Sequence, residues 1–327
     1  MKATTLSTVP MSRSDAAVLS PILLWAALGT LMTAFSLWVF GQWFTSADAF
    51  ARVPLTEADA MQPLTLALLR GVEVISTSVA VWALWHYLFK PWIRTGHAPI
   101  TGLALIGALI TYVFDTTINF HDFHMSFNKH SFNFGTWAAG FPGHTGPTHY
   151  AEAWFWGPPM YLYFGIAVAT LQLKVLDVLK PRAGSAAAWI AAFVTAFLFD
   201  LAVEPSIINF AEGYSWPYTV GALSLWSGTQ FQFPLYESLF VAIYGSLYTL
   251  LMRSERDRGI SFIERGVERL PSALRLPTRL LAVTGYASIA TMIYFGGFYA
   301  FSQFADSRVA QPSYLMYGDA DWAPPSK

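Results

Sequence analysis

The stretch PILLWAALGTLMTAFSLWVFGQWF, residues 21–44, decides the fold class because it contains no Asp, Glu, Lys or Arg. A helix of about 20 apolar residues is long enough to cross the hydrocarbon core of a bilayer. Further runs of this kind follow, and the whole chain is 54% hydrophobic and only 12% charged, with a mean hydropathy of +0.42. Soluble domains carry about 25% charged residues. The sequence therefore predicts an integral membrane protein.

Seven apolar runs are long enough to span a bilayer, which predicts an all-α polytopic helix bundle over residues 21–305. The runs cover residues 21–44, 64–88, 100–119, 154–173, 186–208, 231–252 and 280–304. The segment 217–226 is too short to span and is expected to be interfacial or re-entrant. A polar segment, 1–20, precedes the bundle, and a polar tail, 306–327, follows it. The composition of residues 317–327 is typical of disorder.

The Lys and Arg residues predict the orientation of the bundle. With the N-terminus inside, the segments 1–20, 89–99, 174–185 and 253–279 face the cytoplasm and hold 14 of the 19 Lys and Arg residues. The positive-inside rule then favours an N-in, C-out topology. The run MRSERDRGISFIERGVERLPSALR, residues 252–275, is predicted to form an amphipathic helix on the cytoplasmic surface, or to act only as a topology anchor. A net charge of -1 gives no indication of a nucleic-acid partner, and the absence of Cys excludes disulfides and thiolate chemistry.

Ionisable side chains inside membrane spans are costly, and each of them is a candidate functional residue. Those in the predicted spans are Arg70, Glu73, Asp115, Asp200, Glu204 and Glu237, with Asn119 as a polar neighbour of Asp115. In the predicted topology all of them lie in the outer halves of four helices. This common depth predicts one site. The alternative is a buried charge network that orients the helices, in which Arg70 neutralises Glu73 or Asp200.

Five carboxyl groups against one Arg predict acid–base chemistry. Unpaired carboxyl groups in a low-dielectric site tend to hold protons, so that one group acts as an acid while an ionised neighbour acts as a base. Arg70 would keep one carboxyl group ionised. Aromatic side chains at the same level can stabilise a cation or form an interfacial belt. The candidate substrate-binding residues near this level are Asn209, Trp154, Trp156, Tyr214 and Trp216.

A cluster of histidines follows the third run, in the segment HDFHMSFNKH, residues 121–130. His121, His124 and His130 suggest a metal site, a lid or rim of the substrate site, or a solvated loop. The HxxxH and HxxHH spacings of membrane di-iron enzymes are absent. His121 and His124 are therefore predicted to bind substrate at the rim, and no metal or other cofactor is expected.

Four motif areas carry a resemblance to a known family. They are FDTTINF (114–120), WFWGPPMYLYFG (154–165), FDLAVEPSIINFAEGYSWPY (199–218) and FPLYESLF (233–240). With the chain length and the seven-span pattern, they resemble the AveC-like spirocyclase family of bacterial integral-membrane proteins over about residues 20–305. The DLAVEP…GYSWPY portion is also similar to a pattern in membrane carotenoid hydratases. Both resemblances imply proton-driven cyclisation, hydration or dehydration without a redox cofactor, in the bacterial inner membrane.

The predicted function is an acid–base cyclase, hydratase or dehydratase acting on a lipophilic polyketide or terpenoid. Glu204 or Asp200 would protonate the substrate, and Asp115 or Glu237 would balance the resulting cation. The predicted partners are this small molecule and the bilayer, with the oligomeric state left open. Two alternatives remain, which are a histidine-liganded metal-dependent oxidase or hydroxylase and a proton-coupled transporter.

Overall fold

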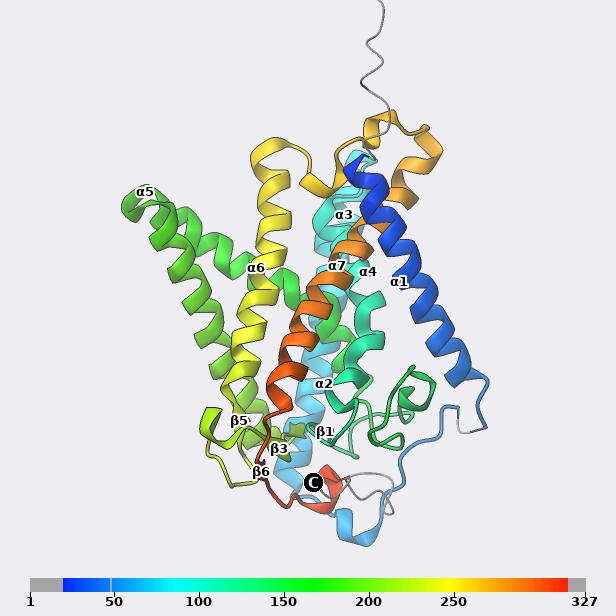
Figure 1. The fold of residues 1–327 in the computed structure, drawn as a ribbon, viewed down its shortest axis with the longest axis vertical. Coiled ribbons are helices and arrows are strands. Elements are labelled where there is room, and N and C mark those ends of the chain that lie inside the picture. The colour runs from blue at the N-terminus through cyan, green and yellow to red at the C-terminus, as the bar shows by residue number, and fades with distance from the viewer. Residues whose placement is uncertain (1–19, 48, 317–327) are drawn as a thin grey trace, which may run out of the picture.

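A computed structural model describes residues 20–47 and 49–316 as a bundle of long helices (Figure 1). The helices are α1 (Pro21–Phe44), α2 (Pro63–Ala83), α3 (Lys90–Thr95), α4 (Ile100–Ile110), α5 (Gly157–Ser206), α6 (Leu235–Arg258) and α7 (Ser272–Ser302). Within the described residues, six helical stretches are long and apolar enough to cross a membrane. The predicted all-α membrane bundle is confirmed. Residues 1–19 and 317–327, and with them most of the predicted N-terminal segment and half of the tail, lie outside the described residues.

Helix α5 explains why six stretches correspond to seven predicted spans. The stretch Gly157–Ala211 contains both the predicted fourth and fifth spans. Gly184 interrupts it with φ 81° and ψ 172°, a left-handed conformation that residues with a Cβ atom rarely adopt. The chain turns back there, and Figure 1 shows α5 folded into two limbs. We refer to residues 157–183 as the first limb and to residues 185–206 as the second limb.

Three helices change their winding. Helix α2 continues into α3 through the π-helix η3 (Leu84–Phe89), α4 continues as the 3₁₀ helix η4 (Thr111–Asn119), and α5 ends in the π-helix η6 (Ile207–Ala211). In the last of these, the Asn209 side chain donates a hydrogen bond to the Pro205 carbonyl oxygen at 2.6 Å, which is the acceptor that the Asn209 N–H would use in a regular α-helix. Such irregular turns often occur at functional sites, and Asp115 lies on η4.

Strands and loops close the end of the bundle that is lowest in Figure 1. We call residues 120–156, 212–234 and 303–316 the cap. Its antiparallel strand pairs are β1 (Ser126–Phe127) with β2 (Tyr214–Ser215), β3 (Tyr218–Thr219) with β6 (Ser307–Arg308), and β4 (Ser224–Leu225) with β5 (Phe233–Pro234). The short 3₁₀ turns of this end are η2 (Glu57–Asp59), η5 (Ala138–Gly140), η7 (Gly221–Leu223) and η10 (Ser313–Leu315).

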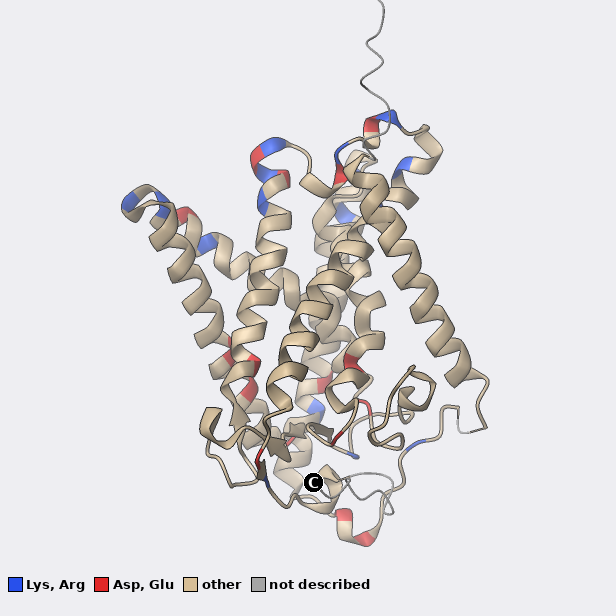
Figure 2. Cartoon of the chain, in the orientation of Figure 1, with Lys and Arg blue, Asp and Glu red and all other residues tan. Residues whose placement is uncertain are grey.

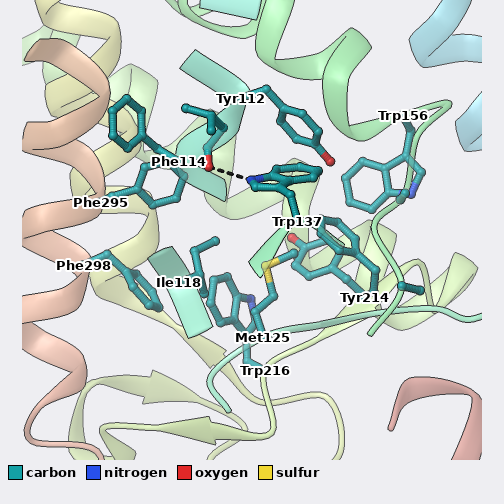
Figure 3. Packing of buried hydrophobic residues seen from close by; sticks show 14 of the residues in the cluster. Tyr112, Phe114, Ile118, Met125, Trp137, Trp156, Tyr214, Trp216, Phe295 and Phe298 are labelled. Atoms are coloured by element: carbon teal, nitrogen blue, oxygen red, sulfur yellow. Dashed lines mark hydrogen bonds between the residues drawn. The ribbon is translucent and has the colours of Figure 1, made fainter. Parts of the chain in front are cut away.

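The histidine-containing loop is packed, and so the interpretation as a solvated loop is wrong. Asn128, Ser131 and Trp137 are fully buried in it. The Trp137 indole donates a hydrogen bond to the carbonyl oxygen of Val113, 2.8 Å away, within a cluster of aromatic side chains from the cap and the helices (Figure 3). The segment 217–226, expected to be interfacial or re-entrant, lies in the cap as β3, η7 and β4.

Basic residues gather at the end of the bundle opposite the cap, as Figure 2 shows. This end contains the predicted cytoplasmic segment 253–279, but the single amphipathic helix predicted there is wrong. Helix α6 ends before Gly259 (φ 74°), and the 3₁₀ turns η8 (Phe262–Glu264) and η9 (Val267–Arg269) follow before α7 begins. Gly259 and Gly266 (φ 97°) adopt left-handed conformations that end helices. The segment is therefore held by turns rather than by a surface helix.

The topology remains a prediction that the absence of Cys makes easy to test. Glu57 in η2 and Glu268 in η9 are exposed, and these two segments lie at opposite ends of the bundle (Figure 1). With the N-terminus inside, a membrane-impermeant thiol reagent should label the Glu57→Cys variant in intact cells. It should label Glu268→Cys only after the membrane has been opened. Labelling of both variants from the same side would contradict the prediction that an odd number of spans separates residue 57 from residue 268.

Candidate functional site

A pocket of about 320 Å³ opens between α2 and the two limbs of α5. We call it the acid pocket because it contains two carboxyl groups. Its remaining lining is almost entirely apolar or aromatic. The lining residues are Val72, Ile75, Ser76, Trp156, Met160, Tyr163, Phe164, Ala167, Phe199, Asp200, Val203, Glu204, Ile207 and Tyr214. Ligand pockets in proteins commonly have this size and a small number of placed polar groups.

Asp200 and Glu204 project into the acid pocket from one face of the second limb. They lie one helical turn apart, as the sequence predicted. The Ser238 hydroxyl donates a hydrogen bond to Asp200 Oδ2 at 2.7 Å, and the Tyr214 hydroxyl donates one to Glu204 Oε2 at 2.7 Å. Each carboxyl group is therefore oriented by one hydroxyl group while it faces the pocket.

Glu237 lies on the neighbouring helix α6 and is buried. It accepts a hydrogen bond from the Tyr294 hydroxyl of α7. The next residue on α6, Ser238, donates the hydrogen bond to Asp200, but Glu237 itself does not line the acid pocket. The structure therefore brings three of the predicted carboxyl groups together, with Glu237 in a supporting position.

Two polar atoms of the acid pocket have unused hydrogen-bonding capacity. Within residues 20–47 and 49–316, Asp200 Oδ1 and Trp156 Nε1 are buried and have no hydrogen-bond partner. Asp200 offers an acceptor and Trp156 offers a donor. Because buried polar atoms are normally paired, these two atoms are the groups most ready to bind polar atoms of a ligand.

A second pair of carboxyl groups, which we call the cap pair, consists of Asp115 on η4 and Glu152 in the cap. Glu152 Oε2 accepts a hydrogen bond from the Tyr112 hydroxyl at 3.1 Å, and Asp115 Oδ1 accepts one from the Tyr161 hydroxyl at 2.6 Å. Burial raises the pKa of Glu152 well above its usual range, and the Asp115 charge beside it raises this pKa further. Burial and the neighbouring Asp115 charge therefore favour the protonated form of Glu152.

Glu152 was not predictable from the sequence because it lies in a polar loop, where an acidic residue is usually solvated. Its complete burial depends on how the cap packs. Asp115 was identified correctly as a deeply placed carboxyl group, but it faces the cap rather than the acid pocket. No sequence signal beyond the nearby Trp154 and Trp156 marked this part of the loop as buried.

Arg70 and Glu73 form a separate group on α2. Their side chains make an ion pair at 2.5 Å, and Arg70 is 45% exposed. Glu73 Oε1 accepts the backbone N–H of Phe132 at 2.7 Å, while Arg70 donates to the carbonyl oxygen of His130 at 2.7 Å. Arg70 therefore neutralises Glu73, as the alternative of a buried charge network predicted. Through His130 and Phe132 the pair holds the loop against α2, away from the acid pocket.

We expect Glu73→Ala to destabilise the fold and leave the chemistry intact. The substitution leaves the Phe132 N–H without its acceptor, which costs about 1–3 kcal/mol when the group is buried. The thermal midpoint of the purified protein should fall, whereas turnover per folded molecule should stay normal. Glu268→Ala, which removes an exposed carboxyl group, is the control. Normal stability with lost turnover would return Glu73 to the catalytic residues.

His121 and His124 do not line the acid pocket. His124 is fully buried, its Nδ1 contacts the carbonyl oxygen of Tyr218 at 3.1 Å, and burial lowers its pKa to about 4. His121 packs against His124 and Tyr299. In the part of the chain that the structure describes, no group of three or more His, Asp or Glu side chains is arranged to hold a metal ion.

The remaining candidates divide between the pocket and the cap. Trp156 and Tyr214 line the acid pocket, whereas Trp216 does not line it and packs against Phe298 (Figure 3). Trp154 stacks on Trp43 of α1, in the same aromatic cluster as Trp137. Asn119 and Asn209 form hydrogen bonds with the backbone instead. Asn119 Oδ1 accepts the N–H groups of His124 and Met125. The Asn209 side-chain amide donates to the carbonyl oxygen of Pro205.

Comparison with known proteins identifies the family. The family model described as "Spirocyclase AveC-like" matches residues 92–317, which is more than half of the chain. The matched region contains all four carboxyl groups of the acid pocket and the cap pair, as well as Glu237, but not α1 or Arg70 and Glu73. No curated protein and no solved structure gives a match. The match and the motifs agree, and the chain belongs to the AveC-like spirocyclase family.

Proposed function

We propose that this protein is a membrane-embedded acid–base enzyme that cyclises or dehydrates a lipophilic substrate in the acid pocket. The observation that carries the proposal is the pairing of Asp200 and Glu204 in an otherwise apolar pocket. Two carboxyl groups one turn apart at this depth do not both ionise readily, because like charges repel in a low-dielectric site. One proton shared between them provides an acid and a base side by side.

The acid pocket suits a substrate that arrives from the lipid. Ile75, Phe199 and Val203 line it and are 65%, 42% and 40% exposed on the apolar outer surface of the helices. Such a surface faces hydrocarbon chains in a membrane. A long alkyl chain can therefore pass between α2 and α5 without crossing water, and only the reacting oxygen atoms need to reach Asp200 and Glu204.

Spiroketal formation illustrates the chemistry, in which a ketone with two hydroxyl groups becomes a spiroketal and releases one water. Glu204 protonates the ketone oxygen, a substrate hydroxyl group attacks the carbonyl carbon, and Asp200 accepts the hydroxyl proton. Asp200, now protonated, gives its proton to the hemiketal hydroxyl, which departs as water and leaves an oxocarbenium ion. The second hydroxyl group attacks this ion and loses its proton to the Glu204 carboxylate, which restores the starting protonation of both side chains.

The pocket offers means to stabilise the cation and to hold the substrate oxygen. The faces of Trp156, Tyr163 and Phe164 line it, and aromatic faces attract cations. Trp156 Nε1 can donate a hydrogen bond to the substrate oxygen. An ionised carboxylate beside the cation adds charge complementarity where the charge develops.

The direct test uses purified protein in lipid nanodiscs and an alkyl-chain dihydroxyketone as the probe. The expected product is a spiroketal with the mass of the probe minus one water. Protein carrying Asp200→Asn together with Glu204→Gln is the negative control. Equal product from this variant and from the wild type would contradict the proposed site.

Removal of metal should not change the rate, because the proposed acid and base are both side chains. We expect the wild type to keep its turnover in a strong chelator, and His121→Gln to keep it as well. Loss of turnover in chelator with recovery on adding a transition metal would instead favour the histidine-liganded oxidase or hydroxylase.

A further inference from the structure

A groove of about 500 Å³ lies beside α2 near the cap and shares no lining residue with the acid pocket. We call it the arginine groove because Arg52 and Arg70 line it. Two aromatic residues of the cap, Phe132 and Phe155, form another part of its wall. The rest of the lining comes from α2 and consists of Glu73, Val74, Thr77 and Ser78. The basic residues gather mainly at the opposite end of the bundle (Figure 2), so two arginines in one groove at this end call for a separate explanation.

The arginine groove carries an excess of positive charge. Glu73 contributes the one carboxyl group of the lining, and it is already paired with Arg70 at 2.5 Å. The exposed Arg52 therefore has no counter-charge in the lining. Two arginines and one glutamate leave the groove with a net charge of +1, which favours an anionic ligand.

Both arginines are held around the same loop of the cap. Arg70 donates to the carbonyl oxygen of His130 at 2.7 Å. The residue after Arg52, Val53, donates its backbone N–H to Asn133 Oδ1 at 3.0 Å, and both of these residues are buried. The backbone on each side of the groove is therefore fixed, while the guanidinium groups remain exposed. A guanidinium group presents several N–H donors in a planar fork that matches the oxygen atoms of a phosphate.

An apolar surface continues from the arginines toward the middle of α2. Phe132 and Phe155 stack with their ring centroids 4.3 Å apart and are 38% and 45% exposed. Val74 and Val81 lie on the same helical face as Arg70 and are 66% and 62% exposed. At 1.5 Å per residue, the distance from Arg70 to Val81 is about 16 Å. This is about half of the roughly 30 Å hydrocarbon core, or the depth of one leaflet.

We propose that the arginine groove binds one anionic phospholipid of the leaflet on the cap side. Its phosphate lies between Arg52 and Arg70, and one acyl chain lies along Val74 and Val81. Phosphatidylglycerol, with a single negative charge, complements the charge of the groove. Phosphatidylcholine has the same phosphate but adds an ammonium group, which the arginines repel. The proposal does not depend on the chemistry of the acid pocket.

A fluorophore in the groove tests the preference for an anionic lipid. Ser78 is exposed and lines the groove, and the chain has no Cys, so that Ser78→Cys can be labelled alone in the full chain. Brominated acyl chains quench a fluorophore on contact. In phosphatidylcholine vesicles, brominated phosphatidylglycerol should quench at about fivefold lower mole fraction than brominated phosphatidylcholine, which is the effect of one arginine near the surface. The label at Ile190→Cys, which is 66% exposed on the second limb, should respond equally to both lipids.

The charge of Arg52 should account for this preference. Arg52→Gln in the Ser78→Cys background should abolish it, and Arg52→Lys should keep part of it because the charge remains. Arg269→Gln removes an equal charge from η9, where Arg269 is 79% exposed, and should leave the preference unchanged. Equal quenching of Ser78→Cys by the two lipids, or a full preference in Arg52→Gln, would overturn the proposal.

Inorganic phosphate separates a lipid headgroup from a soluble anion. Sodium phosphate and sodium chloride at equal ionic strength screen charges alike, so that quenching by brominated phosphatidylglycerol should be the same in both. A loss of quenching in phosphate alone would assign the groove to a soluble anion and overturn the lipid as its occupant.

Discussion

Asp200→Asn and Glu204→Gln should each lower turnover by about 10²-fold or more, because general acid–base catalysis contributes at least that factor. Both substitutions keep the size of the side chain. Asparagine at position 200 can still accept the Ser238 hydroxyl, and glutamine at position 204 can still accept the Tyr214 hydroxyl, so the local hydrogen bonds survive. What disappears is the transferable proton.

The controls separate this loss from misfolding. Asp177→Asn changes a carboxyl group to an amide in the first limb of the same helix, where Asp177 pairs with Arg256 at 2.8 Å away from the acid pocket. It should keep normal turnover. Thermal midpoints and gel-filtration profiles should match the wild type for all three variants. A well-folded double amide variant with near-normal turnover would exclude Asp200 and Glu204 and direct attention to Asp115 and Glu237.

Ala167→Trp should close the acid pocket to substrate. Ala167 is exposed on the outer face of the first limb and lines the pocket, so that a bulky ring can be placed there without entering the helix bundle. Even one methylene group in an apolar pocket changes kcat/KM by about tenfold. We therefore expect a fall in kcat/KM of about tenfold or more, with unchanged thermal stability.

Ile190→Trp is the matched control for this substitution. Ile190 is 66% exposed on the second limb and does not line the acid pocket. The same ring at this position should leave kcat/KM unchanged. If Ala167→Trp left the rate intact as well, the substrate would have to enter by another route, and the lateral opening between α2 and α5 would lose its role.

The helical spans were predictable from sequence because each is an apolar run long enough to cross a bilayer. Several site residues were predictable because an ionisable side chain inside such a run is costly and therefore rare. Asp200, Glu204 and Glu237 were identified in this way, and the structure brings them together. Arg70 and Glu73 were predicted to belong to the same site as these carboxyl groups, but they do not line the acid pocket. The depth of a residue along a helix can be inferred from the sequence, whereas the direction in which its side chain points cannot.

Features that depend on tertiary packing were not predictable. Glu152 resembles a solvated loop residue until the cap encloses it. Tyr161 and Tyr294 are unremarkable in membrane helices, where tyrosine is common, and their contacts with Asp115 and Glu237 join different helices. The predicted surface helix in 253–279 failed because two left-handed glycines outweighed its amphipathic pattern.

The fold-back at Gly184 has a consequence for the biosynthesis of the protein. An isolated second limb would carry two acidic residues into lipid, and an Asp at the centre of a span costs about 2.5–3.5 kcal/mol during insertion. Because the turn holds Lys180 and Arg182, the positive-inside rule predicts that it lies on the cytoplasmic side. We therefore expect the two limbs to enter the membrane as one hairpin, in which the apolar first limb shields the acidic end of the second while the later helices are still being synthesised.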